Sequence, residues 1–200
     1  MRQWNEKYSL VRALHAIPEG EDVDIYINNN PFFKGLEVEE FTPYIYVPEG
    51  EYEITVYLAD TQDNPLVRQR VKVNASELVT IAITGNPEDI QLLPISEDTE
   101  TASGNNSKVR VVHLAPISPE VNILADGQTL FSNIKFRDIT EYKEIPAKVY
   151  DVEIEASSNK QLIRNDQVTI NPNRIYTFYA VGNVPHVSII QSLDGATFIS

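Results

Sequence analysis

Residues 51–58, EYEITVYL, carry apolar side chains at the even positions and mainly polar ones at the odd positions. Successive side chains of a β-strand point to opposite faces, so this pattern predicts a strand with one apolar face. Residues 22–27, 69–73 and 151–156 show the same period. Asn, Asp, Gly and Pro residues separate these stretches, and no stretch of about ten residues has the apolar spacing of a helix. The sequence therefore predicts an all-β protein.

The chain contains two copies of one pattern, because VRALH at residues 11–15 recurs as VRVVH at residues 109–113. The same spacing matches Pro18 with Pro116, Val23 with Val121, Ile25 with Ile123, Thr42 with Thr140, Tyr44 with Tyr142 and Tyr52 with Tyr150. After a one-residue deletion, the matches continue with Val71 and Val168, Thr80 and Thr177, and Gly85 and Gly182. Residues 96–107 are polar apart from a single alanine, which predicts an exposed linker. We therefore expect a first domain at residues 1–95, a linker at 96–107 and a second domain at 108–200.

Each copy is expected to form seven or eight short strands, spaced about 8–12 residues apart. This spacing favours an antiparallel β-sandwich over a β-barrel, which is the alternative that the same pattern allows. The predicted architecture is therefore two β-sandwich domains in tandem.

Composition narrows the classes of function. The 200 residues carry a net charge of −13, which disfavours attraction to nucleic acid or to an anionic membrane. The chain has no cysteine, which excludes disulfides, zinc–thiolate sites and thiol nucleophiles. No apolar run approaches the roughly 18 residues of a membrane span, so we expect no membrane insertion. Residues 1–7 do not resemble a signal peptide, so we expect cytoplasmic synthesis unless the chain is a mature or trimmed form.

The repeated pattern resembles the bacterial family catalogued as domain of unknown function 4397. The resemblance rests on a Val-Arg-x-x-His strand, a short loop with proline, and a Val-(Asp/Asn)-Ile strand followed by a turn. The second copy carries it as VRVVHLAP at residues 109–116, VNI at 121–123 and Asp126-Gly127, while the first copy is a looser match. The resemblance covers nearly the whole chain. It implies immunoglobulin-like sandwiches of envelope or exported proteins, often in tandem, and no known reaction.

His15 and His113 occupy equivalent positions at the end of the first expected strand of each copy. Neutral imidazole is a common ligand, so these two residues are candidates for ligand binding. A zinc site needs three or four ligands, and no second acid or histidine recurs near both positions. We therefore favour a structural role, in which each ring bonds the loop that follows. Arg12 and Arg110 lie on the opposite strand face, and we expect each to cover apolar surface or to pair with a carboxylate.

Tyrosine is abundant, with ten residues against one tryptophan. We expect some of the rings of Tyr44, Tyr46 and Tyr57 to lie on an exposed sheet face of the first domain, because their strand neighbours face the core. Rigid amphipathic rings suit contacts with proteins or sugars, so these three residues are candidate binding residues. The alternative is that they support neighbouring strands. Tyr52 and Tyr150, which both copies keep, are expected to be core or corner residues.

Acidic residues do not predict catalysis here. Residues 19–24, EGEDVD, offer oxygen ligands for calcium, but residues 117–122 of the second copy keep a single acid, so a solvated loop is favoured. The alternating acids at 51–53 and 153–155 are expected on an outward face, where charge deters aggregation. No motif for a nucleophile, a phosphate or a dinucleotide is present. We therefore expect no enzyme activity, no metal and no cofactor.

The two copies differ in charge, with a net of −9 over residues 1–95 and −1 over residues 108–200. The favoured hypothesis is a non-catalytic structural or interaction protein of a bacterial envelope or spore surface, with protein partners or self-association. A spore coat would reconcile an envelope-type domain with the missing signal. Strand addition by the apolar residues 197–199 is one route to self-association. The alternative hypothesis is a carbohydrate- or ligand-binding module that uses the tyrosines of the first domain.

Overall fold

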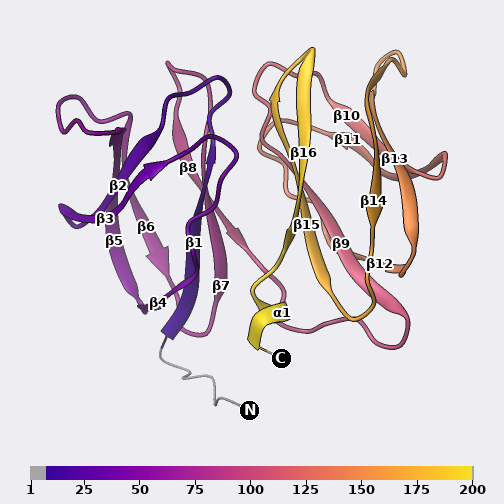
Figure 1. The fold of residues 1–200 in the computed structure, drawn as a ribbon, viewed down its shortest axis with the longest axis horizontal. Helices are drawn as coiled ribbons and strands as arrows, with labels where there is room; N and C mark the ends of the chain where they lie inside the picture. The colour runs from indigo at the N-terminus through magenta and orange to yellow at the C-terminus, as the bar shows by residue number, and fades with distance from the viewer. Residues whose placement is uncertain (1–7, 200) are drawn as a thin grey trace. The chain divides into compact units, whose positions relative to one another are not determined.

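The computed structural model describes residues 8–199 of the chain, except for the side chains of the last two (Figure 1). The chain divides into two compact units, with the boundary between them after Glu97 and the second unit running from Asp98 to Phe198. Each unit contains eight strands within the described residues, and each sheet is built from strands of one unit only. The all-β prediction and the two tandem immunoglobulin-like sandwiches are confirmed. We refer to the two halves as the first unit and the second unit.

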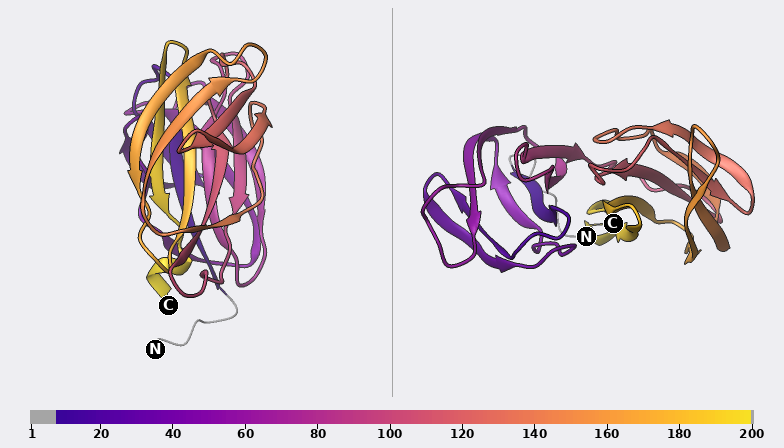
Figure 2. Two further views of the ribbon diagram at one scale, coloured as in Figure 1. Left: turned by 90° about the vertical axis from the view of Figure 1, so that its right-hand side faces the viewer. Right: turned by 90° about the horizontal axis from the view of Figure 1, so that it is seen from above.

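The first unit is a sandwich of two four-stranded sheets, seen end-on in the right-hand view of Figure 2. One sheet has the strand order β4-β1-β7-β8 and the other β3-β2-β5-β6. The strands are β1 (Tyr8–Ala16), β2 (Val23–Ile27), β3 (Asn30–Leu36), β4 (Ile45–Pro48), β5 (Gly50–Leu58), β6 (Val67–Val73), β7 (Leu78–Thr84) and β8 (Gln91–Ser96).

The second unit repeats this topology, with sheets of order β12-β9-β15-β16 and β11-β10-β13-β14. Its strands are β9 (Asn106–His113), β10 (Val121–Ala125), β11 (Gln128–Ile134), β12 (Lys143–Pro146), β13 (Val149–Ala156), β14 (Leu162–Thr169), β15 (Ile175–Asn183) and β16 (His186–Leu193). The short helix α1 (Ala196–Ile199) follows β16.

One strand pair in each unit is parallel, which the expected antiparallel sandwich did not include. β1 pairs with β7 in the first unit, and β9 pairs with β15 in the second, both in parallel. The two-residue period of the sequence reports which face a side chain occupies and says nothing about the direction of the neighbouring strand. The direction therefore could not be inferred from the pattern that predicted the strands.

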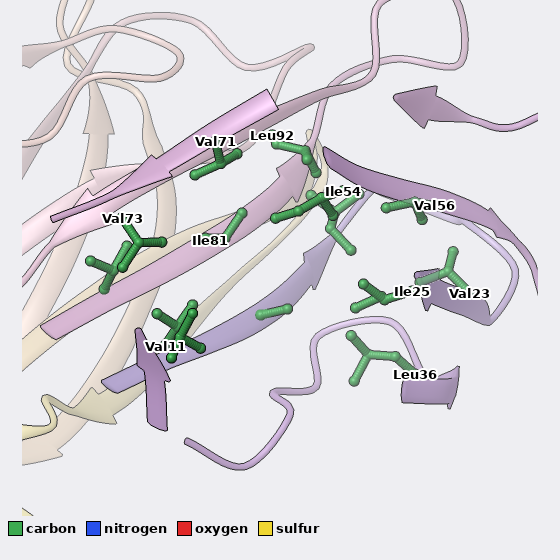
Figure 3. Packing of buried hydrophobic residues seen from close by; sticks show 14 of the residues in the cluster. Val11, Val23, Ile25, Leu36, Ile54, Val56, Val71, Val73, Ile81 and Leu92 are labelled. Atoms are coloured by element: carbon green, nitrogen blue, oxygen red, sulfur yellow. The ribbon is translucent and has the colours of Figure 1, made fainter. Parts of the chain in front are cut away.

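Apolar residues of both sheets fill the space between them. In the first unit, Val11 of β1 and Ile81 of β7 pack with Ile54 of β5 and Val71 of β6, and Figure 3 shows them gathered in one cluster. In the second unit, Val109 and Val111 pack with Ile123, Ile154 and Val168 in the corresponding cluster. Of the even positions of residues 51–58, Ile54 and Val56 lie in the core and Tyr52 packs against it, as the alternation predicted. Each core is made by one unit alone.

Turn residues and one tyrosine recur in both units. Asn28-Asn29 and Asp126-Gly127 connect β2 to β3 and β10 to β11 with positive φ at both residues of each pair, as two-residue hairpins require. The Tyr52 hydroxyl donates to the Pro48 carbonyl at 2.8 Å, and Tyr150 donates to Pro146 at the same distance. These bonds fix the corner between β4 and β5 and the corner between β12 and β13.

The segment between the units is shorter than the expected linker. β8 ends at Ser96 and β9 begins at Asn106, so strand residues occupy both ends of the range 96–107. Glu97 and Ala102 are also buried. Residues 196–199 form a helix where a strand-prone tail was expected, so strand addition by this segment has no preformed strand to use. No helix in residues 8–199 combines the length and apolar character of a bilayer span.

Candidate functional site

Both equivalent histidines are buried at the end of the first strand of their unit, and their rings bond the next loop. The backbone N–H of Ile17 donates to His15 Nδ1 at 3.3 Å. Nε2 of His15 therefore carries the hydrogen and donates to the Glu21 carbonyl at 2.9 Å. His113 repeats the arrangement with the N–H of Ala115 at 3.2 Å and the Pro119 carbonyl at 3.3 Å.

Burial lowers the pKa of both His15 and His113, because the charged imidazolium loses hydration in the interior. Each ring is therefore neutral and uses both nitrogens within its own loop. A metal or ligand would have to displace one of these hydrogen bonds. This geometry is what the structural alternative for the two histidines predicts, and residues 8–199 contain no group of three acids or histidines placed to hold a metal ion.

A buried ionic cluster lies on the outward face of the β4-β1-β7-β8 sheet; we call Arg12, Tyr44, Thr80 and Glu97 the first polar cluster. Arg12 Nε donates to Thr80 Oγ1 at 2.8 Å, and Thr80 Oγ1 donates to Glu97 Oε1 at 2.5 Å. The Tyr44 hydroxyl lies 2.7 Å from the other oxygen of the same carboxylate. Arg12 Nη2 is 3.6 Å from Glu97 Oε1.

Two aromatic rings cover the guanidinium of this cluster. The Arg12 guanidinium carbon lies 4.2 Å from the centre of the Phe41 ring and 4.5 Å from the centre of the Tyr44 ring. Cation–π contacts of this kind are stronger when water is excluded. Arg12 thus pairs with a carboxylate, as the sequence interpretation allowed, and does so out of contact with bulk solvent.

The second unit contains the same arrangement in Arg110, Tyr142, Thr177 and Asp194, the second polar cluster. Arg110 Nε donates to Thr177 Oγ1 at 2.9 Å, and Thr177 Oγ1 donates to Asp194 Oδ2 at 3.0 Å. The Tyr142 hydroxyl also donates to Asp194. The Tyr142 ring covers the Arg110 guanidinium, with 4.4 Å between the guanidinium carbon and the ring centre.

The acids of both clusters were missed by sequence reasoning. Glu97 lay within the expected linker, which looks exposed by composition, and Asp194 lay outside the positions that we matched between the two copies. The signal that identifies them is the repeat itself, because the spacing of 97 that matches Thr80 with Thr177 also matches Glu97 with Asp194. The hydrogen bonds of each cluster join strands of one sheet. Burial beside the Asp194 carboxylate raises the pKa of Tyr142, so the phenol stays neutral and donates.

The three candidate tyrosines lie in different surroundings. Tyr46 on β4 is 61% exposed, as expected for a residue on an outward face. Tyr44 is half-buried in the first polar cluster. Tyr57 on β5 is buried and packs edge-on against Tyr26, with ring centres 5.4 Å apart, so it is not among the exposed rings. Tyr57 and Tyr26 cover each other across neighbouring strands, which an alternating pattern does not reveal.

The acidic loop also differs from expectation at one residue. Asp24 is buried, although residues 19–24 were expected to form a solvated loop. Its carboxylate accepts hydrogen bonds from the backbone N–H groups of Gly35 at 2.9 Å and Asp60 at 3.3 Å. In the second unit, Asn122 accepts from the N–H of Asn133 at 3.0 Å. The Asp24 carboxylate therefore holds the backbone of the neighbouring strand β3 through the Gly35 N–H.

The fold and the bonded histidines define a tandem immunoglobulin-like β-sandwich protein. The polar residues repeated in its two units form hydrogen bonds that stabilise each sandwich. The chain belongs to the family described as Domain of unknown function (DUF4397), whose model matches residues 9–124 and again residues 107–197. The overlapping matches are consistent with two tandem copies, so the family resemblance is confirmed. No curated protein sequence matches the chain.

Solved structures similar to this chain include CBMbc (family CBM26) from Eubacterium rectale Amy13K in complex with maltoheptaose. That structure is 10% identical, with a TM-score of 0.29, and the match covers 94% of this chain and 99% of that one. A structure described as alpha-glucan binding by a streptococcal virulence factor is 11% identical, with a TM-score of 0.29, over 92% of this chain and 97% of that one. Scores of this size support no inference about function.

Proposed function

We propose that this chain is a non-catalytic structural or interaction protein of a bacterial cell envelope or spore surface. One observation carries the proposal: the polar residues that recur at matched positions in the two copies bond to other residues of their own unit. His15 and His113 bond their own loops, and the two polar clusters join strands of one sheet. What the duplication preserved is therefore a stable frame. A frame of this kind gains its function from the side chains that it presents outward.

The outward side chains differ between the two copies. Tyr46 on β4 corresponds to Glu144 on β12, and Arg70 on β6 corresponds to Gln167 on β14. The two copies thus share the fold and its internal hydrogen bonds, but they differ in the side chains on their outward faces. This division supports two distinct contact surfaces on one chain and gives no support to a repeated active site.

Fractionation of the native cell tests the proposed location. An antibody against the chain is expected to detect it in envelope or spore-coat fractions and to label the surface of intact cells or spores after mild washing. Recovery of the chain only from the cytosol, at all growth stages including sporulation, would count against this proposal.

Exposure of Tyr46 supports a second candidate function, binding of a carbohydrate at β4 of the first unit. The ring is 61% exposed on an outward sheet face, and exposed aromatic rings stack on the apolar faces of sugars. A glycan array should give signals that Tyr46→Ala removes and Tyr46→Phe retains, because stacking needs the ring and not the hydroxyl. Signals that survive Tyr46→Ala would exclude this site.

A further inference from the structure

We propose that Arg68, Arg70 and Lys72 of β6 form a binding surface for an acidic polysaccharide, which we call the basic stripe. All three side chains are exposed and alternate with partly or fully buried residues. Side chains two positions apart in a strand lie on one face at a spacing of about 7 Å. The stripe is therefore a straight row of three cations along one strand at the edge of its sheet. This inference rests on the proposed interaction role and specifies one ligand of the first unit.

The basic stripe concentrates the cations of an acidic unit. Residues 1–95 have a net charge of −9, yet among described residues of the first unit the exposed cations are these three and Lys34. Lys34 lies on β3 of the same sheet and is 3.5 Å from Asp24. Arg12, the remaining cation in that part of the chain, is buried in the first polar cluster. Among the described residues of the unit, the exposed positive charge therefore lies on the β3-β2-β5-β6 sheet alone.

Within the described part of the chain, the side chains of the basic stripe do not form ion pairs with neighbouring carboxylates. Arg68 Nη2 contacts the Tyr57 hydroxyl at 3.4 Å. Arg70 and Lys72 stand opposite Glu53 and Glu51 in the β5–β6 register, but neither forms an ion pair within 4.0 Å among residues 8–199. By contrast, Lys135, Lys160 and Arg164 of the second unit are paired with Glu120, Glu155 and Asp166 at 3.5, 3.3 and 2.6 Å.

Protection of a sheet edge does not explain the stripe. Charged side chains on an edge strand commonly prevent strand-to-strand aggregation. The equivalent edge strand β14 of the second unit has Asn165, Gln167 and Thr169 at the same register positions, all exposed and uncharged. These three positions of the edge strand therefore need no cation in this fold, although β14 carries Arg164, which is paired with Asp166, at another position. A row of guanidinium and ammonium groups instead matches a chain of carboxylates, which arginine binds through paired hydrogen bonds.

The test measures binding of the full chain to polygalacturonate at low and at high salt. The wild-type chain is expected to bind at low salt and to weaken steeply as salt is raised. Arg68→Gln/Arg70→Gln/Lys72→Gln is expected to bind at least about tenfold more weakly, because three charge contacts are lost together. The matched control Lys135→Gln/Lys160→Gln/Arg164→Gln changes the net charge equally and should bind like the wild type.

Several results would overturn the proposal. These are no binding by the wild type, binding that salt does not weaken, or equal losses in the two triple variants. Poly-glutamate binding as tightly as polygalacturonate, with the same loss in the stripe variant, would assign the stripe to an acidic peptide and also overturn it. The proposed surface location is judged by fractionation, so its failure and the failure of the stripe are read from different measurements.

Discussion

At the scale of single residues, the two histidines show how a repeated polar residue can be structural. Each ring closes the loop after the first strand, accepting a hydrogen bond at Nδ1 and donating one at Nε2. Only the neutral ring can do both, because the imidazolium has no acceptor nitrogen. Loop closure is therefore coupled to the protonation state of a residue that ordinarily titrates near neutral pH.

We predict that both units lose stability when the pH falls below about 6.5. The pKa of His15 and of His113 is lowered from 6.5 in the folded state, so in this range the unfolded chain binds protons that the folded chain does not. Stability is full above that pH and falls progressively below it, because each protonated histidine of the unfolded chain favours unfolding. Urea denaturation at about pH 7.5 and about pH 5.5 measures the loss. It should shrink in His15→Gln/His113→Gln, and an unchanged loss in that variant would contradict the assignment.

The first polar cluster gives a second prediction at this scale. Glu97→Leu is expected to destabilise the first unit by about 3–5 kcal/mol, because it leaves the buried Arg12 guanidinium without its carboxylate. Arg12→Met/Glu97→Leu should recover much of that loss, because an apolar pair has no charge to desolvate. Chemical denaturation of the two single variants and the double variant measures the coupling. Additive losses would show that the ion pair is not a unit.

At the scale of elements, the hairpin from β15 to β16 depends on one glycine that both copies keep. Gly182 has a φ of +83°, and a side chain there would place Cβ 2.3 Å from the His186 carbonyl oxygen. Gly35, which also has a positive φ, has open space around it, and Asn133 occupies the equivalent position in the second unit. The two glycines have similar backbone conformations, but only at Gly182 would an added side chain also clash with a neighbouring residue.

We predict that Gly182→Ala destabilises the second unit by at least about 2 kcal/mol, because it combines backbone strain with a clash against backbone. Gly35→Asn is the control and should change stability by no more than about 0.5 kcal/mol, because asparagine tolerates this conformation. Thermal unfolding monitored by circular dichroism compares the two variants. Equal losses would mean that conformation alone, and not the contact with His186, sets the cost.

At the scale of the whole molecule, the sequence predicted the structural features that follow from the local order of apolar and polar residues and from the repeat. Alternation identified the strands, and the repeated spacing identified two copies of one sandwich. The parallel pairing of β1 with β7 was not predicted, because period two carries no direction. The burial of Tyr57 and Glu97 was also missed, because both depend on residues distant in sequence, Tyr26 and Arg12. Candidate sites were therefore harder to infer than strands, since burial is decided by tertiary contacts.

The C-terminal boundary of the first unit predicts how stable fragments of different length will be. A fragment of residues 1–95 lacks Glu97 and leaves Arg12 buried without its carboxylate, whereas a fragment of residues 1–99 keeps the pair. We expect the shorter fragment to be less stable by about 3 kcal/mol or more. Glu97→Gln in the longer fragment should account for part of the difference, and the end of β8 for the rest. Equal denaturation midpoints for both fragments would contradict this expectation.

The position of each acid, directly after the last strand of its unit, also bears on how the chain arose. A gene segment that ended with the codons for the last strand would have encoded a copy with an uncompensated buried arginine. A copy that carries its own partner for the arginine therefore extends one residue past its last strand, to Glu97 in the first unit and to Asp194 in the second. The same boundary should mark every further tandem copy in the family, as an acid that follows the final strand at the same spacing from its Val-Arg-x-x-His strand.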